Sequence, residues 1–293
     1  MRSIALVLLA GTSVACGSSE ASSPARSAAP EPSAAPEPSA APTTLVIASY
    51  NVLYALAEAK EGVEPARAAD PETLERARTL EADLVLFQET NDTWEAALRA
   101  RLSERYPYCT FHAPRRYLPE GLGACARQPL VADTSLASPV GWFPAQRLTW
   151  QAPGGAVEVV NVHLRPAVAG SDTWWATHRE TRPLRRQELE AYLRQLPPDA
   201  PALVVGDYNE VPEGDVFRAL DAAGFAHALP GAGVRAPTWH WAGTELEAQL
   251  DHVAYRADAF ELVAARVLDG GRSDHVPVVV TLARRGSGAR RGP

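Results

Sequence analysis

Residues 203–209 (LVVGDYN) decide the fold, because they join a buried strand to an abrupt polar end. The aliphatic run predicts a strand, and the segment Gly206-Asp207-Tyr208-Asn209 then delivers a carboxylate and an amide to a sheet edge. Polar groups at the ends of buried strands are where open α/β sheets place their sites. This segment alone is weak evidence for a site.

Five other segments present polar side chains at or beside an apolar run. They are SYNVL (49–53) with Asn51, LVLFQET (84–90) with Glu89, VVNVHLRP (159–166) with His163, QLDHVAY (249–255) with Asp251, and RSDHVPVVV (272–280) with Asp274 and His275. So many carboxylate, amide and imidazole groups in the same setting are hard to explain by stability alone. We therefore expect these distant stretches of chain to meet in one pocket.

The rest of the domain mixes strands and helices without the strict alternation of a doubly wound sheet. Strand patterns occupy residues 44–52, 83–88, 106–112, 121–127, 147–151, 157–164, 202–205, 238–241, 249–255, 260–268 and 276–282. Helical patterns occupy residues 71–80, 92–98, 174–196 and 215–223, the third interrupted near Pro183. This mixture predicts an α/β fold in which two packed sheets have helices outside.

The first residues are typical of an export signal, with Arg2 before a short apolar run that is too short to span a membrane. The sequence Ser-Val-Ala-Cys that ends at Cys16 resembles a bacterial lipoprotein signal, in which the thiol is lipidated. Ser13 stands where a larger aliphatic residue is usual, and ordinary secretory cleavage is the alternative. We expect a protein exported and lipid-anchored to the bacterial cell envelope.

Composition then divides the chain into a lipoprotein signal peptide (1–16), a disordered linker rich in Pro, Ala and Ser (17–43), one large domain (44–284) and a disordered tail (285–293). The formal net charge is −7, so a simple basic footprint for nucleic acid is absent. A nuclease is not excluded, because bound cations and local arginine clusters can hold phosphate. We expect the domain to act as a monomer.

The chain has 3 Cys. With Cys16 lipidated, Cys109 and Cys125 remain, and in an oxidising compartment they either form a disulfide or stay as two buried thiols. No spacing of Cys or His suggests a zinc site.

The polar residues suit the hydrolysis of a phosphoester, which needs charge neutralisation, a positioned water and a proton for the leaving oxygen. Glu89 is a hard oxygen ligand suited to Mg²⁺, and Asn51 could bind the metal or hold its water. Asp207 and Asn209 are two residues apart, so they point the same way if that segment is extended. Asp251 and His275 suit a carboxylate–imidazole pair.

Each residue also has a structural alternative. Asn51 could be a turn residue, Glu89 could cap the next helix, His163 could be a satisfied core histidine, and Asp207 could close an Asx-turn. The other histidines lack supporting neighbours, and His252 should face away from Asp251 on a strand.

The order Gln88-Glu89, Gly206-Asp207-Tyr208-Asn209 and Ser273-Asp274-His275 resembles the endonuclease/exonuclease/phosphatase superfamily, also called the deoxyribonuclease-I-like fold. The resemblance covers most of residues 44–283. Tyr208 stands where Phe is commoner, and Gln249 stands where many members carry Arg.

The resemblance implies a four-layer α/β sandwich and a Mg²⁺- or Mn²⁺-dependent phosphoric ester hydrolase. The implied catalytic residues are His163, Asp207, Asn209, Asp251 and His275, and the implied metal-binding residues are Asn51, Glu89 and Asp274. The substrate is expected to be a phosphodiester or phosphomonoester, in a nucleic acid or a phospholipid head group. Trp174 and Trp175 could stack on it or pack in the core. The alternative is a catalytically silent binding module of the same fold.

Overall fold

The computed structural model describes residues 43–57, 69–168, 170 and 173–285. The expected signal peptide, lipidated Cys16 and almost all of the linker lie outside the described residues, as does the tail from residue 286. Within the described part of the chain, no helix is long and apolar enough to cross a membrane.

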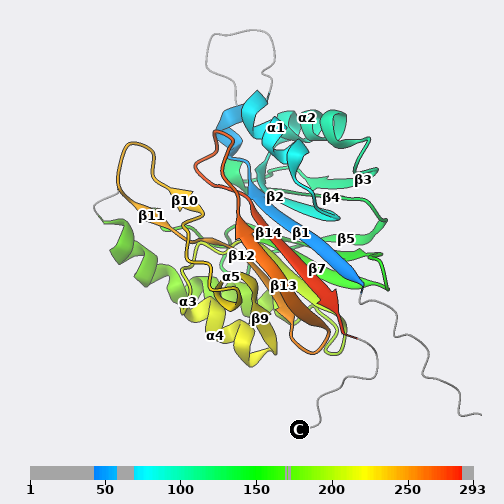
Figure 1. Cartoon of the computed structure of the whole chain (residues 1–293). Helices are drawn as coiled ribbons and strands as arrows, with labels where there is room; N and C mark the ends of the chain where they lie inside the picture. The colour runs from blue at the N-terminus through cyan, green and yellow to red at the C-terminus, as the bar shows by residue number, and fades with distance from the viewer. Residues whose placement is uncertain (1–42, 58–68, 169, 171–172, 286–293) are drawn as a thin grey trace, which may run out of the picture. The chain divides into compact units, whose positions relative to one another are not determined.

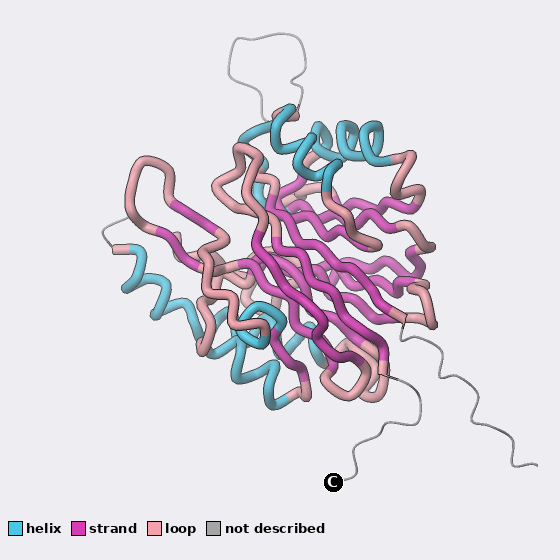
Figure 2. The backbone as a smooth tube through the Cα atoms, in the orientation of Figure 1, coloured by secondary structure: helices cyan, strands magenta, loops and turns pink. Residues whose placement is uncertain are grey.

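Two six-stranded mixed sheets form the centre of the domain, as the sequence predicted (Figure 2). The first sheet has the order β13-β14-β1-β2-β4-β3, and the second has the order β5-β6-β7-β8-β12-β9. The strands of the first sheet are β1 (Thr44–Asn51), β2 (Leu84–Thr90), β3 (Tyr108–His112), β4 (Gly121–Ala126), β13 (Phe260–Val267) and β14 (Val278–Arg284). Those of the second are β5 (Leu130–Leu136), β6 (Ala145–Trp150), β7 (Val157–His163), β8 (Ala202–Asp207), β9 (Phe225–His227) and β12 (Asp251–Arg256).

Helices cover the outer faces of both sheets, which gives the four layers (Figure 1). The helices α1 (Pro71–Thr79) and α2 (Asp92–Leu102) pack on the first sheet, and α3 (Trp174–Leu193) and α4 (Asp215–Ala222) pack on the second. Short elements complete the fold: the 3₁₀ turns η1 (Tyr54–Ala57) and η2 (Leu118–Glu120), α5 (Ala228–Gly231), and the hairpin of β10 (Trp239–His240) and β11 (Glu247–Ala248).

Alternation along the strands creates the layers, because successive side chains point to opposite faces of a sheet. In β1, Ile47 packs between the two sheets, whereas Ala48 and Tyr50 face the helices α1 and α2. In β8, Val205 packs between the sheets and Val204 faces α3 and α4. Sequence periodicity therefore fixes both the inner core and the outer cores.

Three details differ from the sequence-based predictions. The helix α3 runs without interruption through the exposed Pro183, and β5 was not predicted. Arg285, the first residue of the predicted tail, is still attached to the domain, because its backbone N–H donates to the Ala259 carbonyl directly after β14.

Cys109 and Cys125 form a disulfide, so the alternative of two free thiols is not realised. The two residues lie directly opposite each other on the antiparallel strands β3 and β4. The bridge ties the edge strand β3 to the interior of its sheet.

Candidate active site

The inner faces of both sheets change from apolar to polar toward one end of the sandwich. Along β7, the inward residues are Val157, Val159, Asn161 and His163, and only the last two are polar. At this end the Gln88 side-chain amide donates to Asn161 Oδ1 across the two sheets, at 2.8 Å. The polar end of the sandwich is therefore a built site, held together by hydrogen bonds between the sheets.

Strand register places three of the predicted residues side by side in the second sheet. Asp207 at the end of β8 pairs with His163 on β7 and with Asp251 on β12. The strand β8 can lie this close to β7 because Gly206 has no Cβ: a Cβ at this position would lie 2.0 Å from the Val162 carbonyl oxygen. Gly206 also has a φ of 140°. A glycine is therefore required immediately before Asp207.

The first sheet contributes Asn51 and Glu89 from its neighbouring strands β1 and β2. A register shift in β2 occurs at Glu89, which has a φ of 57°. The Asn51 side-chain nitrogen lies 3.1 Å from Glu89 Oε1 and 3.3 Å from Asp207 Oδ2, and so joins the two sheets. Its oxygen accepts from the Leu53 backbone N–H at 3.1 Å. Asn51 thus presents N–H groups, rather than its oxygen, to the carboxylates.

The loop before β14 brings in His275. Ser273 fixes this loop, because its hydroxyl donates to the Asn51 carbonyl and accepts from the His275 backbone N–H. His275 Nδ1 lies 2.8 Å from Asp251 Oδ2, and its Nε2 lies 3.7 Å from Asp207 Oδ2. The predicted carboxylate–imidazole pair is present, with the other imidazole nitrogen facing the next carboxylate.

The segment after Asp207 is not extended, contrary to the expectation from residue spacing. Asn209 has a φ of 47°, and its backbone N–H donates to Asp207 Oδ1 at 2.8 Å. The Asx-turn proposed as a structural alternative therefore exists alongside the site placement. The Asn209 side chain donates to the Leu164 carbonyl and still lines the pocket.

Burial of several acidic groups shifts the pKa values in the site. Burial raises the pKa of Glu89 to about 7 and, with the charges of Asp251 and Glu89 and against that of His275, the pKa of Asp207 to about 8. Burial lowers the pKa of His163 to about 3. Burial also opposes protonation of His275, but the carboxylates of Asp251 and Asp207 outweigh it and hold that pKa well above its ordinary value. The site favours an additional positive charge.

A divalent cation fits this donor set. Glu89 and Asp274 supply hard carboxylate oxygens, and Asp274 Oδ1 is buried without a hydrogen-bond partner among the described residues. The other Asp274 oxygen accepts from the Trp239 indole N–H at 3.1 Å. Asp207, Asp251 and His275 also bring ligand-type atoms within 4.8 Å of one another. Because Asp251 Oδ2 already contacts His275 Nδ1, Glu89 and Asp274 are the carboxylates better placed to hold a cation.

These side chains open into a pocket of about 200 Å³ whose remaining walls are mostly apolar and aromatic. It is lined by Leu53, Tyr54, Glu89, Pro119, Phe143, His163, Pro166, Ala167, Trp174, Asp207, Asn209, Trp239, Trp241, Leu250, Asp274 and His275. Asn51 and Asp251 stand behind this lining. Trp174 and Trp239 are stacked, with ring centroids 5.2 Å apart, whereas Trp175 is 44% exposed and does not line the pocket.

Sequence reasoning missed Pro119 as a wall residue, whereas the aromatic pair of Trp142 and Phe143 is expected close to a site-bearing segment. The Phe143 ring lies 4.6 Å from the His163 ring, and the Pro119 carbonyl lies 3.1 Å from His163 Nδ1. Pro119 lies in the 3₁₀ turn η2, whose approach to the site depends on sheet order, and no local motif marks it.

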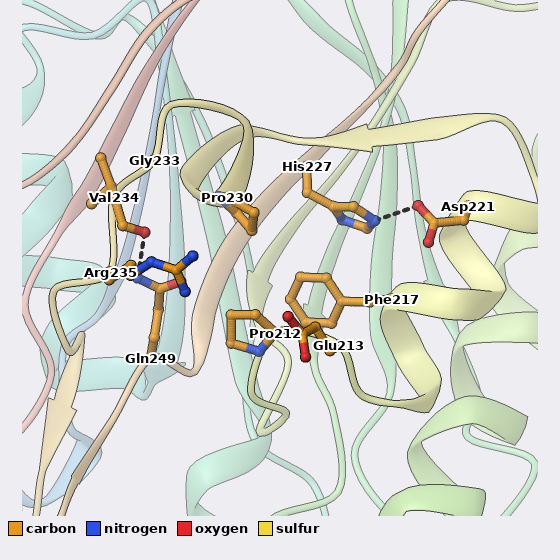
Figure 3. A pocket seen from close by; sticks show the side chains of 10 residues that line it. All are labelled: Pro212, Glu213, Phe217, Asp221, His227, Pro230, Gly233, Val234, Arg235 and Gln249. Carbon is orange, nitrogen blue, oxygen red and sulfur yellow. Dashed lines mark hydrogen bonds and ion pairs between the residues drawn. The ribbon is translucent and has the colours of Figure 1, made fainter.

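A larger cavity, of about 470 Å³, lies elsewhere between α4 and the loop before β10 (Figure 3). Its lining includes Phe217, Pro212 and the ion pair of His227 with Asp221, in which the side chains lie 2.8 Å apart. None of the predicted site residues lines it. Cavity size alone would therefore have indicated the wrong location.

Comparison with known proteins agrees with this geometry. The model of the endonuclease/exonuclease/phosphatase family matches residues 48–275. No curated protein matches the chain.

Similar solved structures share the fold. An endonuclease/exonuclease/phosphatase from Beutenbergia cavernae DSM 12333 is 22% identical, with a TM-score of 0.62, and the match covers 83% of this chain and 72% of that one. ANGEL2, a 2′,3′-cyclic phosphatase solved with adenosine-2′,3′-vanadate, is 16% identical, with a TM-score of 0.62 and coverage of 82% and 96%. The human Nocturnin catalytic domain with bound sulfate is 18% identical, with a TM-score of 0.58 and coverage of 83% and 95%. The chain belongs to the endonuclease/exonuclease/phosphatase family, whose members are phosphoester hydrolases.

Proposed function

We propose that this protein is a Mg²⁺- or Mn²⁺-dependent hydrolase that cleaves a phosphodiester or phosphomonoester by attack of an activated water. The observation that carries the proposal is the meeting of Glu89, Asp207 and His275 in one pocket, although they come from different sheets and a loop. The family membership supports phosphoester chemistry, and the oxygen-rich donor set supports a hard divalent cation.

Proton transfer in the proposed reaction uses Asp207, Asp251 and His275. Asp251 fixes the orientation of the His275 ring and stabilises its protonated form through the 2.8 Å contact. Asp207 and Asn209 position the attacking water, with Asp207 as its proton acceptor. His163 is buried and held neutral, and its Nδ1–H donates to the Pro119 carbonyl, so Nε2 faces the pocket as a hydrogen-bond acceptor.

That assignment requires both His163 nitrogens to be considered. The Pro119 carbonyl can only accept, so Nδ1 carries the proton in the neutral ring and Nε2 is an acceptor before substrate binds. Nε2 lies 3.5 Å from Asp207 Oδ2. His163 therefore contacts the phosphoryl group only as an acceptor, from a proton carried by a phosphoryl or leaving oxygen, because its lowered pKa opposes a second ring proton.

Glu89 and Asp274 would hold the cation, and Asn51 would keep the Glu89 carboxylate in place. When bound, the cation supplies charge neutralisation at the phosphoryl oxygens and lowers the pKa of bound water. Trp239 holds Asp274 through its indole N–H, so the aromatic wall and the proposed metal site are structurally connected.

A substrate panel with metal controls tests the proposal. We expect hydrolysis of DNA, RNA, sphingomyelin or bis(4-nitrophenyl) phosphate that stops with EDTA and returns with Mg²⁺ or Mn²⁺. Folded protein that turns over none of them with any divalent metal would favour the binding-module alternative. Substitution of an essential residue would be the sign of such a module, yet every predicted site residue is present.

We also propose that the protein is exported and lipid-anchored at Cys16 in the bacterial cell envelope. The support is the sequence of residues 1–16 and the Pro-rich segment that follows. Labelling of the chain with a fatty-acid analogue should be lost in a Cys16→Ser variant. Release of that variant in soluble form, with equal activity, would separate anchoring from catalysis.

A further inference from the structure

Four planar side chains form a continuous stack beside the pocket, which we call the Arg165 platform (Arg116, Tyr117, Trp142 and Arg165). The Arg165 guanidinium lies 4.3 Å from the Trp142 ring centroid. The Trp142 and Tyr117 rings are stacked, with centroids 4.7 Å apart and planes at 30°. The Arg116 guanidinium lies 5.1 Å from the Tyr117 ring. Cations thus lie over aromatic rings at both ends of one stack.

Phe143 connects the platform to the proposed catalytic pocket. Its ring lies 5.3 Å from Trp142 and 5.9 Å from Tyr117, measured between centroids. The same ring lies 4.6 Å from His163 and lines the pocket. Arg165 follows His163 by two residues at the end of β7. The platform is therefore one aromatic ring away from the position proposed for the reacting phosphate.

The two platform arginines form no ion pair with a carboxylate of any described residue. Arg147 on the same sheet, by contrast, pairs with Glu158 at 2.8 Å. The nearby carboxylate of Glu188 accepts instead from the Ser138 hydroxyl and from the backbone N–H of Arg165. Arg165 Nε has no hydrogen-bond partner within the described ranges. The charge of Arg165 still acts on Glu188, and Arg116 donates to the Gly141 carbonyl, but neither guanidinium is held in a direct ion pair.

We propose that the Arg165 platform binds the nucleoside and second phosphate that adjoin the scissile phosphate in a short single-stranded oligonucleotide. This inference rests on the proposed phosphodiesterase function and names its substrate class. Because both rings are covered within the stack, an unpaired base would stack on the outer face of a terminal guanidinium, which keeps N–H groups at its edge to donate to phosphate.

The charge distribution favours a short oligonucleotide over a long polymer or a lipid surface. The formal net charge of −7 opposes extended contact with a polyanion, so local cations must supply the attraction. A lipid head group would fill the pocket but would not need an interleaved stack of rings and guanidinium groups. Membrane binding is therefore the competing outcome of the test.

The test compares two substrates that differ in what lies beyond the scissile phosphate. The trinucleotide pTpTpT carries further bases and phosphates, whereas bis(4-nitrophenyl) phosphate carries a single phosphate. We expect Arg165→Gln to lower kcat/KM about tenfold for pTpTpT, mainly through KM, and less than about twofold for bis(4-nitrophenyl) phosphate. Arg165→Lys should show an intermediate loss, because it keeps the charge without the planar stack.

Arg256→Gln is the matched control, because Arg256 also lies over a ring, with its guanidinium 4.9 Å from Phe225, at the opposite end of β12. The Arg256→Gln variant should have an unchanged kcat/KM for both pTpTpT and bis(4-nitrophenyl) phosphate. Equal losses for both substrates, or no loss for pTpTpT, would overturn the proposal. So would an Arg165-dependent affinity for phosphatidylglycerol vesicles without one for pTpTpT.

A binding measurement separates failure of this proposal from failure of the proposed function. Calorimetric titration of pTpTpT into His275→Ala protein needs no turnover, and Arg165→Gln in that background should weaken binding by about tenfold. If Arg165→Gln weakens binding but the wild-type protein shows no hydrolysis, the platform stands and the catalytic assignment is rejected. If the wild-type protein hydrolyses the substrate but Arg165→Gln leaves binding unchanged, the catalytic assignment stands and the platform is rejected.

Discussion

Two buried charged clusters share the segment that follows β8 but have opposite electrostatic character. The site cluster contains Glu89, His163, Asp207, Asp251 and His275. The Glu210 cluster contains His178, Arg182, Arg185 and Glu210, and Glu210 follows Asp207 by only three residues. In the first, acidic groups exceed the basic groups available to neutralise them. In the second, one carboxylate meets two guanidinium groups and an imidazole.

The pKa directions show what this difference means. Burial raises the pKa of Asp207 to about 8, because the neighbouring groups do not compensate for lost water. Burial would also raise the pKa of Glu210, but His178 and Arg185 outweigh it and hold that pKa below its ordinary value. Asp207 and Glu210 are both shielded from solvent. The Glu210 cluster is neutralised by its own residues, whereas the site cluster is completed by a ligand. We infer that charge imbalance, rather than burial, marks the functional site.

The largest expected effect comes from removing proton-transfer groups of the site cluster. We expect His275→Ala and Asp207→Asn each to lower kcat by about 10²–10⁴-fold, the usual contribution of a general acid or base. The measurement is steady-state hydrolysis, with circular dichroism to confirm the fold. Near-normal turnover in either variant would mean that the two residues do not have the roles assigned to them.

The Glu210 cluster should respond in stability instead. We expect Glu210→Gln to lower the free energy of unfolding by about 3–5 kcal/mol, because it leaves the buried Arg185 without its carboxylate. Urea denaturation measures this change. Glu190→Gln is the control, because that carboxylate is 40% exposed and its pair with Arg186 lies at the surface, where ion pairs contribute little to stability. If the two variants are equally stable, the Glu210 cluster is not the structural one.

Removing one acidic group from the site cluster should weaken metal binding without a comparable loss of stability. We expect Glu89→Gln to raise the Mg²⁺ concentration for half-maximal activity by about 10–100-fold. Because the Glu89 pKa is about 7 in the protein without metal, protons compete with the cation below that pH. Mg²⁺ affinity of the wild type should therefore increase from pH 5.5 to pH 7.5, measured by calorimetry. An unchanged Mg²⁺ requirement in the variant would place the cation elsewhere.

The excess of acidic groups in the site cluster should also be measurable through the pKa of His275. Because the carboxylates of Asp251 and Asp207 raise the pKa of His275, Asp251→Asn should lower that pKa. NMR titration of the ring in metal-free protein measures this shift. Asp221→Asn supplies the comparison, because it removes the exposed partner of His227 and should leave His275 unaffected.

Much of the site was predictable because it depends on local patterns. Apolar runs that end in polar residues identified Glu89, Asp207 and His275, and the pairing of Asp251 with His275 followed from their chemistry. What a local pattern cannot give is strand order. The alignment of His163, Asp207 and Asp251 in one row depends on β7, β8 and β12 being neighbours, and these strands are far apart in sequence.

The errors in the predicted fold have physical causes too. β5 is an edge strand with mostly exposed residues, so it lacks the alternation that marks a half-buried strand. Pro183 lies on the exposed face of α3, where the lost backbone hydrogen bond is compensated by packing of the buried face. The turn at Asn209 was only an alternative to an extended segment, because the left-handed conformation of a single residue leaves no periodic signal.

His252 joins the two clusters and gives the smallest predicted effect. Its Nε2 lies 3.1 Å from the Glu210 carbonyl and 3.0 Å from that of Gln249, so the ring donates there and remains neutral. Burial lowers the His252 pKa to about 4, whereas the unfolded chain titrates near its ordinary value. Below pH 6.5 the unfolded state therefore binds a proton that the folded state refuses, and stability falls as the pH falls toward 4.

A His252→Gln variant tests this pH dependence, since the glutamine amide can donate to the same carbonyls without titrating. Relative to its own stability at pH 7, the variant should lose about 1 kcal/mol less than the wild type on going to pH 5.5, measured by urea denaturation. Parallel pH profiles, separated by a constant offset, would contradict this prediction, because they would mean that His252 has the same pKa in the folded and the unfolded protein.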